Sequence, residues 1–202
     1  PVVKSPPHGP GSAAQSLPPG RLSNVEKILH APCGKRPAMP EPLFETDCSF
    51  TREGAWFRYR TTAVILRNGQ VLMTRNDADP YYYSVGGAVR AGETAQEAVV
   101  REVLEETGMR MEVDRLVFVH ENFFEGSEGL KGLRCHEVAL YFLMKVPEGF
   151  EPRDGSLSMH GAAEHMEWLP LERFSSYRAY PAFFAEELPR LGPGVRHIVT
   201  KE

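Results

Sequence analysis

The sequence predicts a mixed α/β (α+β) domain in which strands surround one amphipathic helix. Several short runs rich in β-branched and aromatic residues are separated by turn residues, while one run between them, residues 95–107, has helical periodicity. A second, shorter helical run lies near the end of the chain, at residues 182–188. We therefore expect strands both before and after the central helix.

The expected strands follow in order. An extended segment begins at residues 56–59, and the runs 62–66 and 71–74 flank Asn68-Gly69, a pattern typical of a hairpin with a type I′ turn. Residues 171–174 should form a short helix. The remaining strands are expected at residues 81–85, 116–120, 135–146 and 165–169, with a closing strand or tail at 195–200.

Composition divides the chain of 202 residues into two parts. Residues 1–42 are rich in Pro, Gly, Ser and Ala, which predicts a largely irregular N-terminal extension, and residues 43–202 are the expected folded domain. The net charge of −4 gives no basic surface for DNA. No apolar run approaches the ~20 residues of a membrane span, and no signal-peptide pattern is visible, so we expect a cytoplasmic protein without a membrane partner.

The central helix has an apolar and an acidic side. Thr94 and Glu97 have the spacing of a capping box, so the helix should begin at about Ala95, and Gly108 is a natural residue to end it. At ~100° per residue, one side is apolar and should pack on a sheet. This side consists of Val99, Val100, Val103 and Leu104.

The acidic side carries Glu102, Glu105 and Glu106. Like charges at i, i+4 destabilise a helix by roughly 0.2–0.5 kcal/mol, and a divalent cation would remove that repulsion. Clustered carboxylate oxygens suit Mg²⁺ or Mn²⁺. The alternative is a solvated charged face in which Arg101 pairs with Glu105. The glycine-rich turn at residues 86–92 favours the metal site, because it allows close approach of a ligand.

Residues Gly87 to Met109 complete the pattern G-x5-E-x7-R-E-U-x-E-E-x-G-U, where U is a bulky apolar residue. This stretch resembles the Nudix box, and the chain from about residue 58 to residue 202 therefore resembles the Nudix hydrolase family. The resemblance implies the Nudix fold, a mixed β-sheet sandwiched between α-helices. It also implies a Mg²⁺-dependent enzyme, with Mn²⁺ as a possible replacement.

The resemblance further implies roles for individual residues. The matching metal ligands are the backbone carbonyl of Gly86 and the carboxylates of Glu102, Glu105 and Glu106. Glu93 and Arg101 match the pair that braces the loop against the helix. The general base is either a box glutamate, for which Glu102 is our choice, or a carboxylate outside the box, for which we favour Glu164.

The implied reaction is hydrolysis of the diphosphate linkage in a nucleoside diphosphate bonded to another group. The expected substrate is a small nucleotide, either a nucleoside triphosphate or a nucleotide sugar such as ADP-ribose. Two alternatives stay open: a Nudix-like module that binds nucleotide without turnover, and an RNA 5′-end pyrophosphohydrolase. The resemblance is also compatible with a homodimer.

Outside the box, five side chains are candidates for substrate contacts. Tyr83 lies just before the glycine turn, and Phe123 belongs to a segment that could form a pocket wall, although aromatic residues in strands are more often part of the core. Arg75 is a candidate phosphate ligand. Glu121 and Glu137 are candidates as carboxylates, with exposed surface charge as the alternative.

Overall fold

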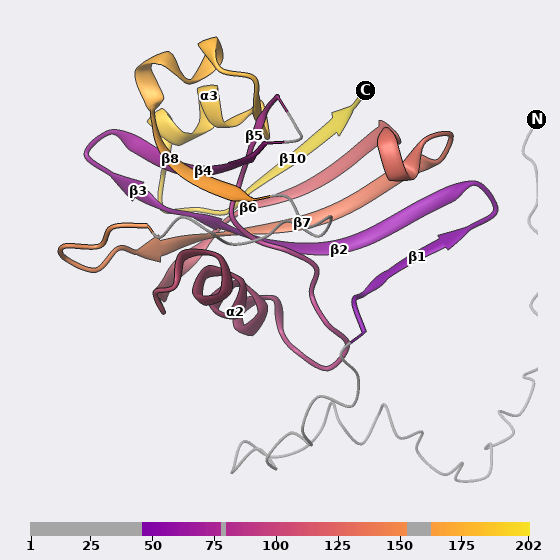
Figure 1. Cartoon of the computed structure of the whole chain (residues 1–202), viewed down its shortest axis with the longest axis horizontal. Coiled ribbons are helices and arrows are strands. Elements are labelled where there is room, and N and C mark those ends of the chain that lie inside the picture. Colours follow the sequence, from indigo (N-terminus) through magenta and orange to yellow (C-terminus); the bar gives the residue numbers. More distant parts are fainter. Residues whose placement is uncertain (1–45, 78–79, 153–162) are drawn as a thin grey trace, which may run out of the picture. The chain divides into compact units, whose positions relative to one another are not determined.

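The computed structural model of the chain describes residues 46–77, 80–152 and 163–202 (Figure 1). Within them the chain forms two β-sheets and few helices, which confirms the predicted mixed α/β (α+β) class. The predicted extension at residues 1–42 lies outside the described residues, so the boundary at residue 43 stays a prediction. No helix in the described ranges is long and apolar enough to cross a membrane.

The first sheet has five strands in the order β1-β2-β7-β6-β10. Their bounds are β1 Ser49–Arg52, β2 Ala55–Val64, β6 Glu112–Glu125, β7 Arg134–Lys145 and β10 Arg196–Lys201. The pairs β2/β7 and β6/β10 are parallel, and the pairs β1/β2 and β6/β7 are antiparallel. β6 is far longer than the strand predicted at residues 116–120, and β1 was not predicted.

The second sheet has the order β3-β4-β5-β9, and β8 also pairs with β4. Its strands are β3 Leu66–Arg67, β4 Gln70–Asn76, β5 Tyr82–Tyr83, β8 Glu164–Pro170 and β9 Ala179–Tyr180. Asn68 and Gly69 join β3 to β4 and both have positive φ, which confirms the predicted hairpin.

One long helix and several short ones complete the described residues. They are α2 Ala95–Thr107, the 3₁₀ turn η1 Glu128–Leu130, η2 Leu171–Ser176, α3 Phe184–Glu187 and η3 Leu188–Arg190. Helix α2 lies on one side of the first sheet, and α3 lies on the other side with β4 and β8 (Figure 1). The helix predicted at residues 182–188 is present as α3, which continues directly into η3.

The core has two clusters, one on each face of the first sheet. Ala63 of β2 packs in the cluster that contains Val99 and Val103 of α2. The next residue, Val64, packs in the cluster that contains Phe184 of α3. Because side chains alternate along a strand, even-numbered positions of β2 face the α3 side. This alternation decides which residues of the sheet can reach the functional site.

The buried side of α2 differs from the expected one at Leu104. Leu104 is 43% exposed, whereas Val103 is fully buried. Positions four apart share one face of a helix, and the buried row on α2 consists of Ala95, Val99, Val103 and Thr107. Ala98 is buried beside this row, so Glu102, four residues later, lies at the border of the core rather than on an open surface.

The two neighbouring positions on α2 should respond differently to truncation. We expect Val103→Ala to lower the free energy of unfolding by about 1–3 kcal/mol, because it removes buried methyl groups and leaves a cavity. Leu104→Ala should change it by less than about 0.5 kcal/mol. Urea unfolding of the full chain measures both values. Equal losses in the two variants would show that Leu104 packs in the core after all.

Candidate active site

Helix α2 begins and ends as the sequence predicts. The Thr94 hydroxyl accepts a hydrogen bond from the Glu97 amide at 3.2 Å, and the Thr94 amide donates to the Glu97 carboxylate at 2.8 Å. At the other end Gly108 adopts the left-handed conformation, and its amide donates to the Leu104 carbonyl. The reciprocal cap sets the start of the helix directly after the glycine turn.

Two glycines bring the turn close to β2 and to α2. Gly86 has φ +135°, and a Cβ atom there would lie 2.3 Å from the Thr61 carbonyl oxygen. A Cβ atom at Gly87 would lie 2.6 Å from a carboxylate oxygen of Glu102. The turn also pairs with the strand, since the Thr61 amide donates to the Gly87 carbonyl at 2.9 Å. Backbone leaves no room for a side chain at Gly86, whereas at Gly87 the obstacle is the end of the Glu102 side chain.

Arg101 joins the turn to the helix. Its Nη2 atom lies 2.6 Å from the Glu93 carboxylate and donates to the Ala88 carbonyl at 3.2 Å. Burial alone would raise the pKa of Glu93, but the hydrogen bonds from Arg101 and the Arg90 amide hold that pKa below its usual range. The structure thus places Glu93 and Arg101 together, in the arrangement that the resemblance implies for a brace.

The three glutamates of the acidic side have different surroundings. Nη1 of Arg101 donates to Glu102 at 2.6 Å and to Glu105 at 3.2 Å. Glu106 instead accepts a hydrogen bond from the Gly86 amide at 2.8 Å. Half of the Glu105 side chain is exposed, whereas only 15% of the Glu102 side chain is. The three carboxylates therefore lie along one edge of α2, next to the turn.

Burial raises the pKa of Glu106 to about 8, and the charges of Glu164 and Glu102 add to this effect despite the opposing hydrogen bond from Gly86. Burial also raises the pKa of Glu102, against the attraction of Arg101. In the absence of a cation, Glu106 has too little positive charge nearby to be ionised at neutral pH. A cation beside these carboxylates would supply it.

The resemblance implies a divalent cation, and the residues fit one in their chemistry. Hard carboxylate oxygens and a backbone carbonyl are the ligands that Mg²⁺ prefers. Among the described residues no three His, Cys, Asp or Glu side chains are arranged as a metal cluster. Arg101 instead holds both Glu102 and Glu105. A bound cation would have to draw these two carboxylates away from the guanidinium.

Glu164, the favoured base outside the box, lies close to the box in the structure. It is the first residue of β8, and its buried carboxylate accepts a hydrogen bond from the Tyr83 hydroxyl at 2.6 Å. Its charge contributes to the raised pKa of Glu106, and both Glu164 and Glu106 contribute to the raised pKa of Tyr83. β8 therefore brings a fourth carboxylate to the acidic edge of α2.

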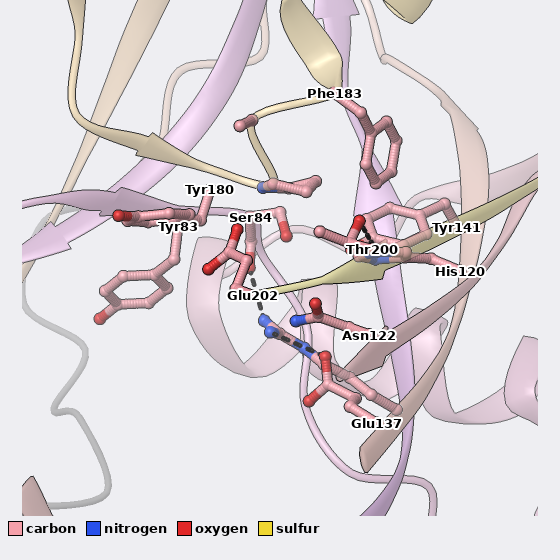
Figure 2. Close-up of a pocket in the computed structure, with 13 residues that line it drawn as sticks. Tyr83, Ser84, His120, Asn122, Glu137, Tyr141, Tyr180, Phe183, Thr200 and Glu202 are labelled. Atoms are coloured by element: carbon pink, nitrogen blue, oxygen red, sulfur yellow. Dashed lines mark hydrogen bonds and ion pairs between the residues drawn. The ribbon is translucent and has the colours of Figure 1, made fainter. Parts of the chain in front are cut away.

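A pocket of about 280 Å³ opens on the α3 side of the first sheet, beside the glycine turn (Figure 2). Figure 2 shows Glu137 and Asn122 on one side of it and Phe183 on the other. The pocket combines polar side chains with aromatic walls, as sites for small organic ligands do. Its lining residues are Arg60, Tyr83, Ser84, His120, Asn122, Glu137, Tyr141, Tyr180, Pro181, Ala182, Phe183, Thr200 and Glu202.

Two lining residues of the pocket, Arg60 and Glu137, belong to an ion-pair network with Arg58. Arg58 pairs with Glu137 and donates to it from Nε at 2.7 Å, and Nη1 of Arg60 lies 4.0 Å from the same carboxylate. Burial alone would raise the pKa of Glu137, but the two arginines hold that pKa below its usual range. Parallel pairing of β2 with β7 sets Arg58 directly beside Glu137.

Arg60, which is not among the residues predicted for the site, connects the pocket with the turn. Its Nη2 atom donates to the carbonyl of Ser84 at 3.0 Å and to the carbonyl of Gly86 at 3.3 Å. The sequence of β2 contained a signal that could have identified Arg60. Arg58 and Arg60 alternate with other residues in a segment that continues into a buried strand, and arginine is seldom buried without a partner.

Two predicted contacts on β6 lie away from the pocket. Because β6 alternates, His120 and Asn122 line the pocket, whereas Glu121 and Phe123 point to the opposite face of the sheet. The Phe123 ring stacks on His136 with 4.2 Å between ring centroids. The Glu121 carboxylate lies 2.8 Å from His197 Nε2.

Arg75 also lies apart from the pocket, on β4. Its Nε atom donates to Glu167 at 2.6 Å, and its Nη1 atom lies 3.6 Å from Asp77. Of the five predicted substrate contacts, the structure therefore brings Tyr83 and Glu137 to the pocket and leaves Arg75, Glu121 and Phe123 outside it.

Comparison with known proteins agrees with this architecture. A MutT-like protein of Streptomyces ambofaciens is 33% identical over 135 residues, which cover 66% of this chain and 77% of that protein. An ADP-ribose pyrophosphatase of Methanocaldococcus jannaschii is 32% identical over 89 residues, which cover 43% of this chain and 49% of that protein. The crystal structure of a MutT protein from Bacillus halodurans superposes with a TM-score of 0.51 at 16% identity, over 71% of this chain and 90% of that chain.

The family assignment rests on the extent of the sequence match. The NUDIX domain matches residues 57–190, which include most of β2 and all of the glycine turn, α2, β6, β7 and β8. The Bacillus halodurans structure supports the fold alone, because its sequence identity is low. The resemblance inferred from the box is thus confirmed, and the chain belongs to the NUDIX hydrolase family.

Proposed function

We propose that this chain is a Mg²⁺-dependent pyrophosphohydrolase that cleaves the diphosphate linkage of a small nucleoside diphosphate derivative. The substrate would be a nucleoside triphosphate or a nucleotide sugar such as ADP-ribose. The observation that carries the proposal is the position of Glu102, Glu105 and Glu106 along one edge of α2, beside a turn that has no side chains at its two central glycines. Diphosphate oxygens can approach such a surface closely.

The residues that would hold the cation are the Gly86 carbonyl and the carboxylates of Glu102, Glu105 and Glu106. When bound, Mg²⁺ neutralises phosphate oxygens and lowers the pKa of a bound water. The chain itself positions these groups: Arg101 and the capped helix start orient the carboxylates, and the Gly86 amide orients Glu106. Mn²⁺ is a possible replacement, because its ligand preferences are similar.

Glu164 is the proton acceptor that the geometry supports best outside the box. The Tyr83 hydroxyl fixes the orientation of its carboxylate at 2.6 Å, and the carboxylate lies close enough to Glu106 to affect its pKa. A general base must lie within hydrogen-bond reach of the attacking water, which has to approach the diphosphate next to the box. Glu102 is the alternative within the box, although Arg101 already holds its carboxylate.

The adjoining pocket would take the nucleoside half of the substrate. Its volume of about 280 Å³ is near the lower end of the ~300–1,000 Å³ that small-ligand sites occupy, so it suits one nucleoside rather than a whole dinucleotide. Tyr180 and Phe183 provide aromatic surface for a base, and Asn122 provides a donor and an acceptor. The other half of the substrate would extend past the box.

Product release from a substrate panel tests the reaction. The panel consists of nucleoside triphosphates, ADP-ribose, NADH, dinucleoside polyphosphates and capped or triphosphorylated RNA, each with Mg²⁺ and with EDTA. We expect metal-dependent turnover of one small-nucleotide class. Glu105→Gln should lower this turnover by at least ~100-fold, the upper end of what even indirect partners of a metal contribute.

The matched control is Glu112→Gln, because Glu112 is exposed at the start of β6 and pairs with Lys145. It should retain wild-type turnover. Turnover of RNA alone would replace the proposal with an RNA 5′-end pyrophosphohydrolase. Tight binding of a nucleotide without any turnover would replace it with a binding module.

Metal binding should also be visible in the stability of the chain without substrate. At 100 times its dissociation constant, a cation that binds only the folded state adds about 2.7 kcal/mol to the free energy of unfolding. We expect Mg²⁺ or Mn²⁺ to raise the melting temperature of the wild type and not of Glu106→Gln. The glutamine keeps an oxygen for the Gly86 amide. An equal metal-induced shift in both proteins would remove Glu106 from the metal site.

We also propose a domain division, a cellular location and an oligomeric state. We retain the division into an extension at residues 1–42 and a domain at 43–202, a cytoplasmic location and a possible homodimer.

A further inference from the structure

Arg60 lies where the pocket meets the glycine turn. Its guanidinium donates to the Ser84 and Gly86 carbonyls on the turn side, and its side chain lines the pocket together with Glu137. The Gly86 carbonyl is one of the groups that would hold a cation in the proposed function. Arg60 therefore donates a hydrogen bond to a carbonyl oxygen that a bound metal would need as a ligand.

The guanidinium of Arg60 makes its hydrogen bonds from a single nitrogen, Nη2. Arg101 donates to Glu93, Glu102, Glu105 and the Ala88 carbonyl. Arg58 pairs closely with Glu137. In contrast, Arg60 Nε is buried without a hydrogen-bond partner, and Nη1 lies 4.0 Å from Glu137, beyond hydrogen-bond distance. A guanidinium held mainly through one nitrogen can turn to another acceptor.

The charges around Arg60 make it a counter-ion of the acidic edge. Burial would lower the pKa of Arg60, but Glu137, Tyr141, Glu106 and Glu102 together raise it, so the side chain is a permanent cation. The same interaction appears on the acidic side, where Arg60 lowers the pKa values of Glu102 and Glu106 against the effect of burial. A divalent cation at these carboxylates would repel Arg60.

We propose that Arg60 couples metal binding to substrate binding by exchanging partners. Without metal it donates to the Gly86 carbonyl beside the acidic edge of α2. With a divalent cation in place it turns toward the pocket and binds a phosphate of the nucleotide. This inference rests on the proposed function, because it assumes that the box holds the cation and that the pocket holds a phosphate-bearing nucleoside.

The exchange predicts effects of opposite sign when Arg60 is replaced. Since Arg60 competes with the metal, Arg60→Gln should strengthen binding of Mn²⁺ alone by roughly fivefold, the low end of typical coupling between two sites. Since Arg60 also binds phosphate, the same variant should weaken nucleotide binding in the presence of Mn²⁺ by about tenfold or more. A purely structural role would weaken both.

Isothermal titration calorimetry of the full chain measures the two affinities. The first titration uses Mn²⁺ alone, and the second uses methylene-bridged analogues of the four ribonucleoside diphosphates at saturating Mn²⁺. Arg52→Gln is the matched control, because it removes the same charge from an exposed position on β1 that does not line the pocket. It should leave Mn²⁺ affinity unchanged. Arg60→Lys keeps the charge, so its Mn²⁺ affinity should stay near that of the wild type.

Two results would overturn the inference. One is Mn²⁺ binding in Arg60→Gln that is unchanged or weaker, and the other is analogue binding that does not fall. The substrate panel separates this failure from failure of the proposed function. Turnover by the wild type together with same-sign effects in Arg60→Gln would leave the hydrolase and remove the exchange. Opposite-sign effects in a chain that hydrolyses nothing would keep the exchange and remove the hydrolase.

Discussion

The guanidinium of Arg101 holds the glycine turn and helix α2 in one arrangement, and the acidic edge depends on it. It bonds to the Glu93 carboxylate, to the Ala88 carbonyl and to Glu102 at the border of the core. The same turn pairs with β2 through the Gly87 carbonyl. Because a charged and partly buried donor is costly to leave unpaired, these contacts form a cooperative unit. The orientation of the carboxylates is thereby tied to the sheet.

The site has two groups of charged side chains, and the two groups have opposite net charge. Glu137 is buried and Glu106 is partly buried, and burial alone would raise the pKa of each. Neighbouring charges decide the direction of the net pKa shift. Glu137 lies beside Arg58 and Arg60, which lower its pKa, whereas Glu106 lies beside Glu102 and Glu164, which raise its pKa. The network of Arg58, Arg60 and Glu137 therefore has more cationic than anionic side chains, and the edge of α2 has the reverse. A metal–diphosphate group carries both signs and suits the boundary between these two groups.

Features set by neighbouring residues were predictable from the sequence. The Thr94–Glu97 cap, the end of α2 at Gly108 and the Asn68-Gly69 hairpin each depend on residues within a few positions of one another. The box was recognisable for the same reason, as its spacing lies within one turn and one helix. Features that join distant segments were not predictable. Examples are the parallel pairing that sets Glu137 beside Arg58, and the position of Thr200, whose hydroxyl lies 2.8 Å from His120 Nε2.

The predicted contacts on β6 show why the pocket was harder to predict than the box. A strand of a one-sided sheet reveals its orientation by alternating apolar and polar residues, but this sheet is covered on both faces near its centre. Phe123 and Asn122 are then equally reasonable choices from the sequence, and only the register separates them. Charge is the more informative signal in such a strand. An arginine beside a buried strand segment needs a counter-ion, and Arg58 and Arg60 find it in the neighbouring strand at Glu137. Opposite charges within two central strands therefore predict both their pairing and the face on which a polar site will form.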